Sequence, residues 1–171
     1  SGCDLQGYTP PIPPYDHQVE ALSLVMHMPR MGLFLDPGLG KTKIGCDLIQ
    51  HTRSEKPNSF WLIIALKVNQ FTWAKEMKFH SKGALELIPI TATGKSRAKK
   101  IDEAIAVDNC VGLVVTYDTC RVAKQLLIDK IPFMTTQEVK RVGWPVPHTL
   151  IDEDTQEVGY IDHDHLHMVG D

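Results

Sequence analysis

The chain has 171 residues, of which 43% are hydrophobic and 23% are charged, and its formal net charge is −3. This size and balance favour one soluble globular domain without a global basic field, although a single basic groove stays compatible with it. The longest apolar run, residues 60–66, is too short to span a membrane. The four cysteines form no CxxC pair, which argues against a zinc or disulfide framework and favours a reducing cytosol, or a host cytoplasm or nucleoid for a viral protein.

The N-terminal part of the chain changes from proline-rich to periodic. Residues 1–14 contain four prolines and predict an extended lead-in. Apolar residues at helical spacing then predict an amphipathic helix over 17–28. The short apolar run Gly32–Leu35 predicts a strand, and a helix-like stretch over 43–49 follows a glycine-containing loop.

That loop, residues 36–42, reads Asp-Pro-Gly-Leu-Gly-Lys-Thr. Its two glycines permit backbone angles closed to other residues, so amides of the loop and of the helix N-terminus can point at an anion. The lysine can reach outer phosphates, and the threonine hydroxyl can ligate Mg²⁺. A plain strand-to-helix turn is the alternative, but the loop and its flanks agree on a nucleoside triphosphate site. The candidate binding residues are Gly38, Leu39, Gly40, Lys41 and Thr42.

Strands and helices alternate through the middle of the chain. Buried strands are predicted over 60–65, 84–91 and 111–116, and helices over 69–80, 96–107 and from 117 to about 130. This alternation predicts right-handed crossovers and an α/β fold with a mostly parallel, doubly wound sheet. Prolines and a glycine predict an irregular insertion over 131–147, residues 149–151 predict one more strand, and residues 158–171 form a His- and Asp-rich tail.

Two acidic side chains follow the last predicted strand. Asp152 can hold Mg²⁺ through water at the strand's carboxyl end, and Glu153 can orient and deprotonate an attacking water. Two apolar residues before Asp-Glu are a common pattern, so a solvated acidic turn is the alternative. The phosphate loop elsewhere in the chain favours the functional interpretation.

A possible base-recognition motif, Tyr15-Asp-His-Gln18, lies upstream of the phosphate loop. The Gln18 side chain offers one acceptor and two donors, which match the adenine edge, and the nearby Tyr15 ring can cover the base. Alone, this segment would be an ordinary helix start. Its spacing from the phosphate loop favours an adenine nucleotide.

In this order the motifs resemble the first motor lobe of superfamily-two helicases and translocases, closest to the chromatin-remodeller (SWI/SNF) type and its phage relatives. Residues 15–18 look like the family's glutamine motif, and residues 36–42 match its first motif, with Pro37 where Met is usual. The resemblance covers residues 8 to about 155. Further similar segments are 63–67 with Trp73 and Glu76, residues 114–119, and the Asp-Glu box at 152–153, which continues with Asp154-Thr155 instead of Ala or Ser and then His.

The resemblance implies a RecA-like lobe over 15–157 that binds ATP and Mg²⁺ and couples hydrolysis to movement along duplex DNA. It implies that Lys67 and Thr116 contact the DNA backbone, and such groups position phosphates without reading sequence. A surface lysine and a strand-end cap are the alternatives. A basic run (Lys95, Arg97, Lys99 and Lys100) extends this face or is simply a solvated helix side.

In that family the site is completed by arginines from a second RecA-like lobe, supplied here in cis or in trans. An arginine finger contributes roughly 10³–10⁵ in rate. We therefore expect this lobe alone to bind nucleotide with weak or absent turnover.

The tail supports a competing interpretation. Residues 162–165 read Asp-His-Asp-His, which resembles part of the HNH nuclease motif, and this donor set suits zinc, manganese or nickel. Adventitious metal binding or a plain polar tail are the alternatives. A small phosphate-loop kinase is a third class, whereas a GTPase would need an Asn-Lys-x-Asp motif that the sequence lacks.

Overall fold

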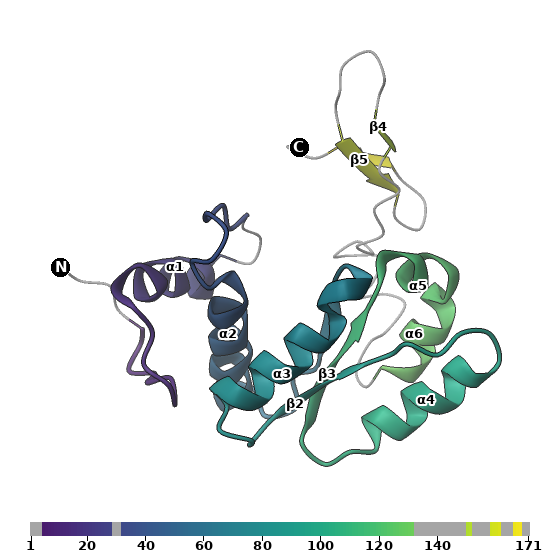
Figure 1. The fold of residues 1–171 in the computed structure, drawn as a ribbon, viewed down its shortest axis with the longest axis horizontal. Coiled ribbons are helices and arrows are strands. Elements are labelled where there is room, and N and C mark those ends of the chain that lie inside the picture. Colours follow the sequence, from purple (N-terminus) through teal and green to yellow (C-terminus); the bar gives the residue numbers. More distant parts are fainter. Residues whose placement is uncertain (1–4, 29–31, 132–149, 152–157, 162–165, 169–171) are drawn as a thin grey trace.

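The computed structural model describes residues 5–28, 32–131, 150–151, 158–161 and 166–168. Helices and strands alternate along the larger part of the chain (Figure 1). None of the described helices is long and apolar enough to cross a bilayer. In chain order the elements are α1 (Asp16–His27), α2 (Lys41–Glu55), β1 (Trp61–Ile64), the short 3-10 helix η1 (Lys67–Asn69), α3 (Gln70–His80), β2 (Glu86–Pro89), α4 (Ser96–Ile105), β3 (Cys110–Val115), α5 (Tyr117–Val122), α6 (Lys124–Lys130), β4 (Leu150–Ile151), β5 (Val158–Ile161) and β6 (Leu166–Met168).

The main sheet has the strand order β1-β3-β2, and both of its strand pairs are parallel. Every residue of the central strand β3 is buried, as its unbroken apolar sequence requires. Gly112 of β3 lies opposite Trp61 of β1, and an added Cβ at Gly112 would come within 2.4 Å of the Trp61 carbonyl oxygen. Only glycine therefore allows this close approach of the two strands.

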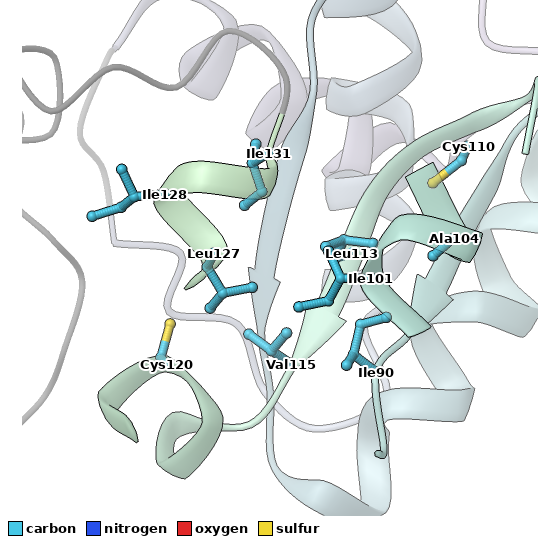
Figure 2. Close-up of a cluster of buried hydrophobic side chains, with 10 residues drawn as sticks. All are labelled: Ile90, Ile101, Ala104, Cys110, Leu113, Val115, Cys120, Leu127, Ile128 and Ile131. Carbon is cyan, nitrogen blue, oxygen red and sulfur yellow. The ribbon is translucent and has the colours of Figure 1, made fainter. Parts of the chain in front are cut away.

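Helices cover both faces of this sheet. On one face, Leu113 and Val115 of β3 pack with Ile101 of α4 and with Cys120 and Leu127 of α5 and α6 (Figure 2). On the other face, a second buried cluster joins the sheet to α2 and α3 through Cys46, Ile49, Met77, Val111 and Val114. The predicted α/β fold, with a parallel sheet between two helical layers, is confirmed.

The prediction of a strand over Gly32–Leu35 is wrong. These residues join no sheet in the described part of the chain. Leu33 and Leu35 pack instead against a helical cluster around Leu22 and Ile44, while the Phe34 side chain is 96% exposed. Alternating side chains thus find their apolar partners on helices, without a strand ladder. As a result β1 is an edge strand, and its residues are half-buried where burial on both faces was predicted.

Two further boundaries differ from the sequence predictions. The single helix expected from 117 to about 130 is divided at Ala123, which leaves helical geometry with φ −114° and ψ 22°. The last predicted strand is the two-residue β4, which pairs antiparallel with β5 in a separate sheet of order β4-β5-β6.

Candidate nucleotide site and adjoining cleft

The phosphate loop, residues 36–42, overlaps the N-terminus of α2, which begins at Lys41. Gly38 and Gly40 have φ values of 87° and 78°, in the left-handed region that favours glycine. Gly40 is also the N-cap of α2. The first amides of the helix therefore face the loop, and the positive end of the helix dipole favours an anion there.

The side chain of Lys41 lies over this loop. Its Nζ donates to the carbonyl oxygens of Leu35 (2.6 Å) and Asp36 (3.2 Å), and the residue is exposed. Thr42, the next residue of α2, is half-buried. The loop and the start of α2 thus combine an exposed cation, a hydroxyl and helix amides, which together suit a phosphate group.

Gln18 of α1 joins the base-recognition motif to the phosphate loop. Its side chain is buried; Oε1 accepts from the Tyr15 amide at 3.0 Å, and Nε2 donates to the Leu39 carbonyl at 3.2 Å. An added Cβ at Gly40 would come within 2.2 Å of Gln18 Nε2. Because an amide has two donor hydrogens and two acceptor lone pairs, these contacts use one of each in Gln18 and leave one of each.

Two aromatic rings flank this contact. Tyr15 is 74% exposed, and its ring stacks on that of His17 with centroids 6.1 Å apart and planes at 16°. The Nε2 atom of His17 lies 3.1 Å from the Leu39 carbonyl oxygen. His17 was not among the predicted site residues, although its place inside the glutamine motif was a signal for it. Together the rings offer an exposed aromatic surface beside the loop.

A buried ion pair lies in the first turns of α2. Lys43 Nζ is 2.6 Å from both carboxylate oxygens of Asp47 and donates to the Ile12 carbonyl at 2.7 Å. Burial raises the pKa of Asp47, and the hydrogen bond from Lys43 opposes that rise. This pair was not among the predicted site residues; two opposite charges four residues apart, next to the apolar Ile44 and Cys46, were the available signal.

A cleft of about 470 Å³ lies at the carboxyl ends of β1, β2 and β3. This is the edge at which parallel α/β sheets usually bind ligands. The cleft brings together Lys67 and Thr116, the two residues predicted to contact nucleic acid, and adds Arg97. The lining also includes Ala65, Leu66, Gln70, Ile90, Thr91, Thr93, Tyr117, Asp118, Thr119 and Val122.

The polar groups of this cleft differ in how they are held. Thr116 Oγ1 accepts from the Thr119 amide at 3.2 Å and so caps α5, which was the structural alternative for this residue. Arg97 is half-buried, and its Nε donates to the Ala92 carbonyl at 3.2 Å. Lys67 is exposed at the start of η1. Threonine hydroxyl groups and the two cations Lys67 and Arg97 therefore line the same cleft.

The basic run divides between this cleft and the outside of α4. Lys100 lies 2.9 Å from the Glu103 carboxylate, and Lys99 lies 3.9 Å from it. Asp118, which lines the cleft, pairs with Arg121 at 3.3 Å. Arg97 is therefore the member of the run that the structure directs into the cleft, and Lys99 and Lys100 form a solvated helix side.

Several predicted site residues lie outside the described part of the chain. These are Asp152 and Glu153, together with the Asp-His-Asp-His tract at 162–165. Among the described residues, no group of three or more His, Cys, Asp or Glu side chains is placed to hold a metal ion.

Comparison with known proteins adds evidence for the fold. No protein-family model matches the sequence, and no curated protein matches it either. Among solved structures, the Sulfolobus solfataricus SWI2/SNF2 ATPase core in complex with dsDNA is similar, with a TM-score of 0.53 and 19% identity. The alignment covers 70% of this chain and 25% of that chain, so this chain spans about a quarter of its length. The likeness is one of fold and is consistent with a RecA-like α/β lobe.

Proposed function

We propose that this chain is the ATP-binding first lobe of a DNA-dependent ATPase of the helicase or translocase type. The observation that carries the proposal is the phosphate loop: two glycines at positive φ precede α2, and the buried Gln18 contacts the loop. These features supply donors for phosphates and for a base from adjacent segments. The similarity of fold to a SWI2/SNF2 ATPase core supports the same class.

The residues of the loop fit a Mg²⁺–nucleotide. An added Cβ at Gly38 would have no atom within 4 Å, so the loop is open at that point. Thr42 would hold Mg²⁺ through its hydroxyl, with Asp152 as the acidic partner, and the ion would neutralise phosphate charge. Lys41 would turn from the loop carbonyls to the outer phosphates, Gln18 and Tyr15 would bind adenine, and Glu153 would deprotonate the attacking water.

The cleft at the carboxyl edge of the sheet is the proposed DNA site. Lys67, Thr116 and their neighbours offer cations and hydroxyl groups, which suit a sugar-phosphate backbone and read no sequence. Duplex DNA is the proposed substrate because the structural neighbour is a complex with dsDNA. A second RecA-like lobe, in cis or in trans, would supply the arginines needed for fast turnover.

Titration calorimetry of the full chain with Mg-ATP and Mg-GTP tests the nucleotide proposal. We expect ATP to bind more tightly than GTP, and Lys41→Ala to weaken ATP binding by at least about tenfold, the effect of losing one charged contact. Lys41 is exposed and donates to loop carbonyls, so its loss should leave the fold intact.

Lys56→Ala is the matched control, because Lys56 is exposed at the opposite end of the same helix. It should bind ATP like the wild type. A folded wild-type chain that binds no ATP would contradict the proposal, and so would equal losses in the Lys41 and Lys56 variants.

A further inference from the structure

We propose that Lys43 and Asp47 are positioning residues for the nucleotide base, and that they act through the proline-rich segment 5–14, here called the strap. The inference rests on the ATP site proposed above and adds to it a determinant of base preference. Neither residue belongs to the phosphate loop or to the glutamine motif.

The strap runs antiparallel to α2. Near one end, the rings of Tyr8 and His51 meet edge to face with centroids 5.1 Å apart. Further along, the Ile12 carbonyl accepts from Lys43 Nζ. From His51 back to Lys43 the helix spans about 12 Å at 1.5 Å per residue. Tyr8 and Ile12 are four residues apart in the strap, which bends at residues 11 and 12, and four residues reach at most about 14 Å, enough to follow the helix over this length. The two contacts therefore fix one register.

In this register the C-terminal end of the strap lies beside the first turn of α2, close to the phosphate loop. Pro10 is buried and Leu5 packs on the cluster around Ile44, so the strap is anchored along its length. Its prolines fix φ and keep it stiff. The strap ends at Pro14, immediately before Tyr15, so its position along α2 determines where the base-recognition residues stand.

The ion pair is suited to holding the strap. The ammonium group of Lys43 has three N–H donors, and the structure directs them to the two oxygens of Asp47 and to the Ile12 carbonyl. Both charged residues are buried, so the strap carbonyl completes the solvation of a charge that water does not reach. Buried ion pairs add little net stability compared with apolar pairs, which favours a positioning role over a stabilising one.

The phosphate loop meets the base-recognition motif at the Leu39 carbonyl, which Gln18 and His17 contact. Its phosphate-facing residues Gly38, Gly40 and Lys41 are also held by the start of α2 and by contacts within the loop. Loosening the strap should therefore disturb the base more than the phosphates. A nucleotide and a plain polyphosphate then distinguish the two effects.

The experiment is calorimetry of the full chain with Mg-ATP, Mg-GTP and Mg-tripolyphosphate. The test variant is Lys43→Met/Asp47→Leu, which removes both charges together and leaves neither one buried alone. We expect ATP affinity to fall about tenfold, as for the loss of a well-placed base contact, with less than about a twofold change for GTP and tripolyphosphate. Lys130→Met/Asp102→Leu is the matched control, since that 2.9 Å pair joins α6 to α4.

A second variant loosens the strap and leaves the buried ion pair of Lys43 and Asp47 unchanged. Pro11→Gly/Pro13→Gly changes two exposed strap residues, so the fold should survive while the strap becomes flexible. It should show the same selective loss of ATP affinity. The result remains decisive if the ion-pair variant does not fold.

Three results would overturn the inference. Equal losses of ATP and tripolyphosphate would mean that the strap supports the loop rather than the base. Unchanged ATP affinity in the folded variants would mean that the strap positions nothing. A wild-type chain that binds neither ATP nor tripolyphosphate would overturn the proposed function and this inference with it, which separates that failure from the first two.

Discussion

Replacing Gly40 with alanine tests the contact between Gln18 and the phosphate loop. Gly40 has a φ of 78°, where an L-residue costs about 1–2 kcal/mol. The new Cβ would lie 2.2 Å from Gln18 Nε2, so the amide must move and give up its bond to the Leu39 carbonyl. A buried group that loses its partner costs about 1–3 kcal/mol. We therefore expect a total loss of about 2–5 kcal/mol in the free energy of unfolding.

Urea denaturation and Mg-ATP calorimetry measure the two consequences. Gly83→Ala is the matched control: Gly83 has a φ of 79°, but an added Cβ there would have no atom within 4 Å. Gly83→Ala should show only the cost of an L-residue at positive φ. Gly40→Ala should therefore be less stable than Gly83→Ala by about 1–3 kcal/mol. ATP affinity should fall at least about tenfold in the Gly40 variant and stay unchanged in the Gly83 variant.

A double variant isolates the contact. In a Gln18→Ala background the amide is absent, so Gly40→Ala should cost only what Gly83→Ala costs. The proposed contact between Gln18 and the loop is refuted if Gly40→Ala lowers stability equally with and without the Gln18 side chain. It is also refuted if the two glycine variants lose equal stability.

Three other measurements follow from the structure. Gly112→Ala should lower the free energy of unfolding by about 1–3 kcal/mol or more, because the Cβ would meet the Trp61 carbonyl; a loss below about 1 kcal/mol in urea would contradict the strand contact. Lys67→Ala should reduce the slope of log affinity for duplex DNA against log salt by about one, while exposed Lys75→Ala should not; equal slopes would remove Lys67 from the DNA site. Burial raises the pKa of the Cys46 and Cys120 thiols to about 12. Above about pH 9 the folded chain therefore keeps protons that the unfolded chain releases, so the free energy of unfolding should be full below pH 9 and fall toward pH 12. A urea midpoint that stays constant from about pH 8 to 11 would contradict this.

The alternation of strand-like and helix-like segments along the chain predicted the α/β fold, because each of these segments was long enough for its hydrophobic pattern to be recognised. Gly32–Leu35 failed because its alternating leucines are equally satisfied by a helical cluster, and periodicity does not say which partner a side chain finds. The division of the helix at Ala123 carries no proline or glycine signal. Burial of β1 was overestimated because it depended on the neighbouring strand that does not form.

In the candidate site too, some features are encoded by consecutive residues and others depend on contacts between residues far apart in the sequence. The glycines of the phosphate loop are recognisable because backbone angles and a following helix are encoded in seven consecutive residues. Lys43 and Asp47 were missed because a pair four residues apart looks like a solvated helix side. Lys43 also donates to the Ile12 carbonyl, a contact that no local pattern specifies.

The strap also affects where a working fragment of this protein can begin. Recognisable motifs start at Tyr15, so motif boundaries would place the first residue there. Such a fragment would keep every recognisable motif but would remove the carbonyl that satisfies the buried Lys43 ammonium and uncover the apolar side of α2. Fragments intended for nucleotide binding should therefore retain residues from Leu5 onward, because the part of the chain with the least recognisable sequence completes the packing of the helix that follows the loop.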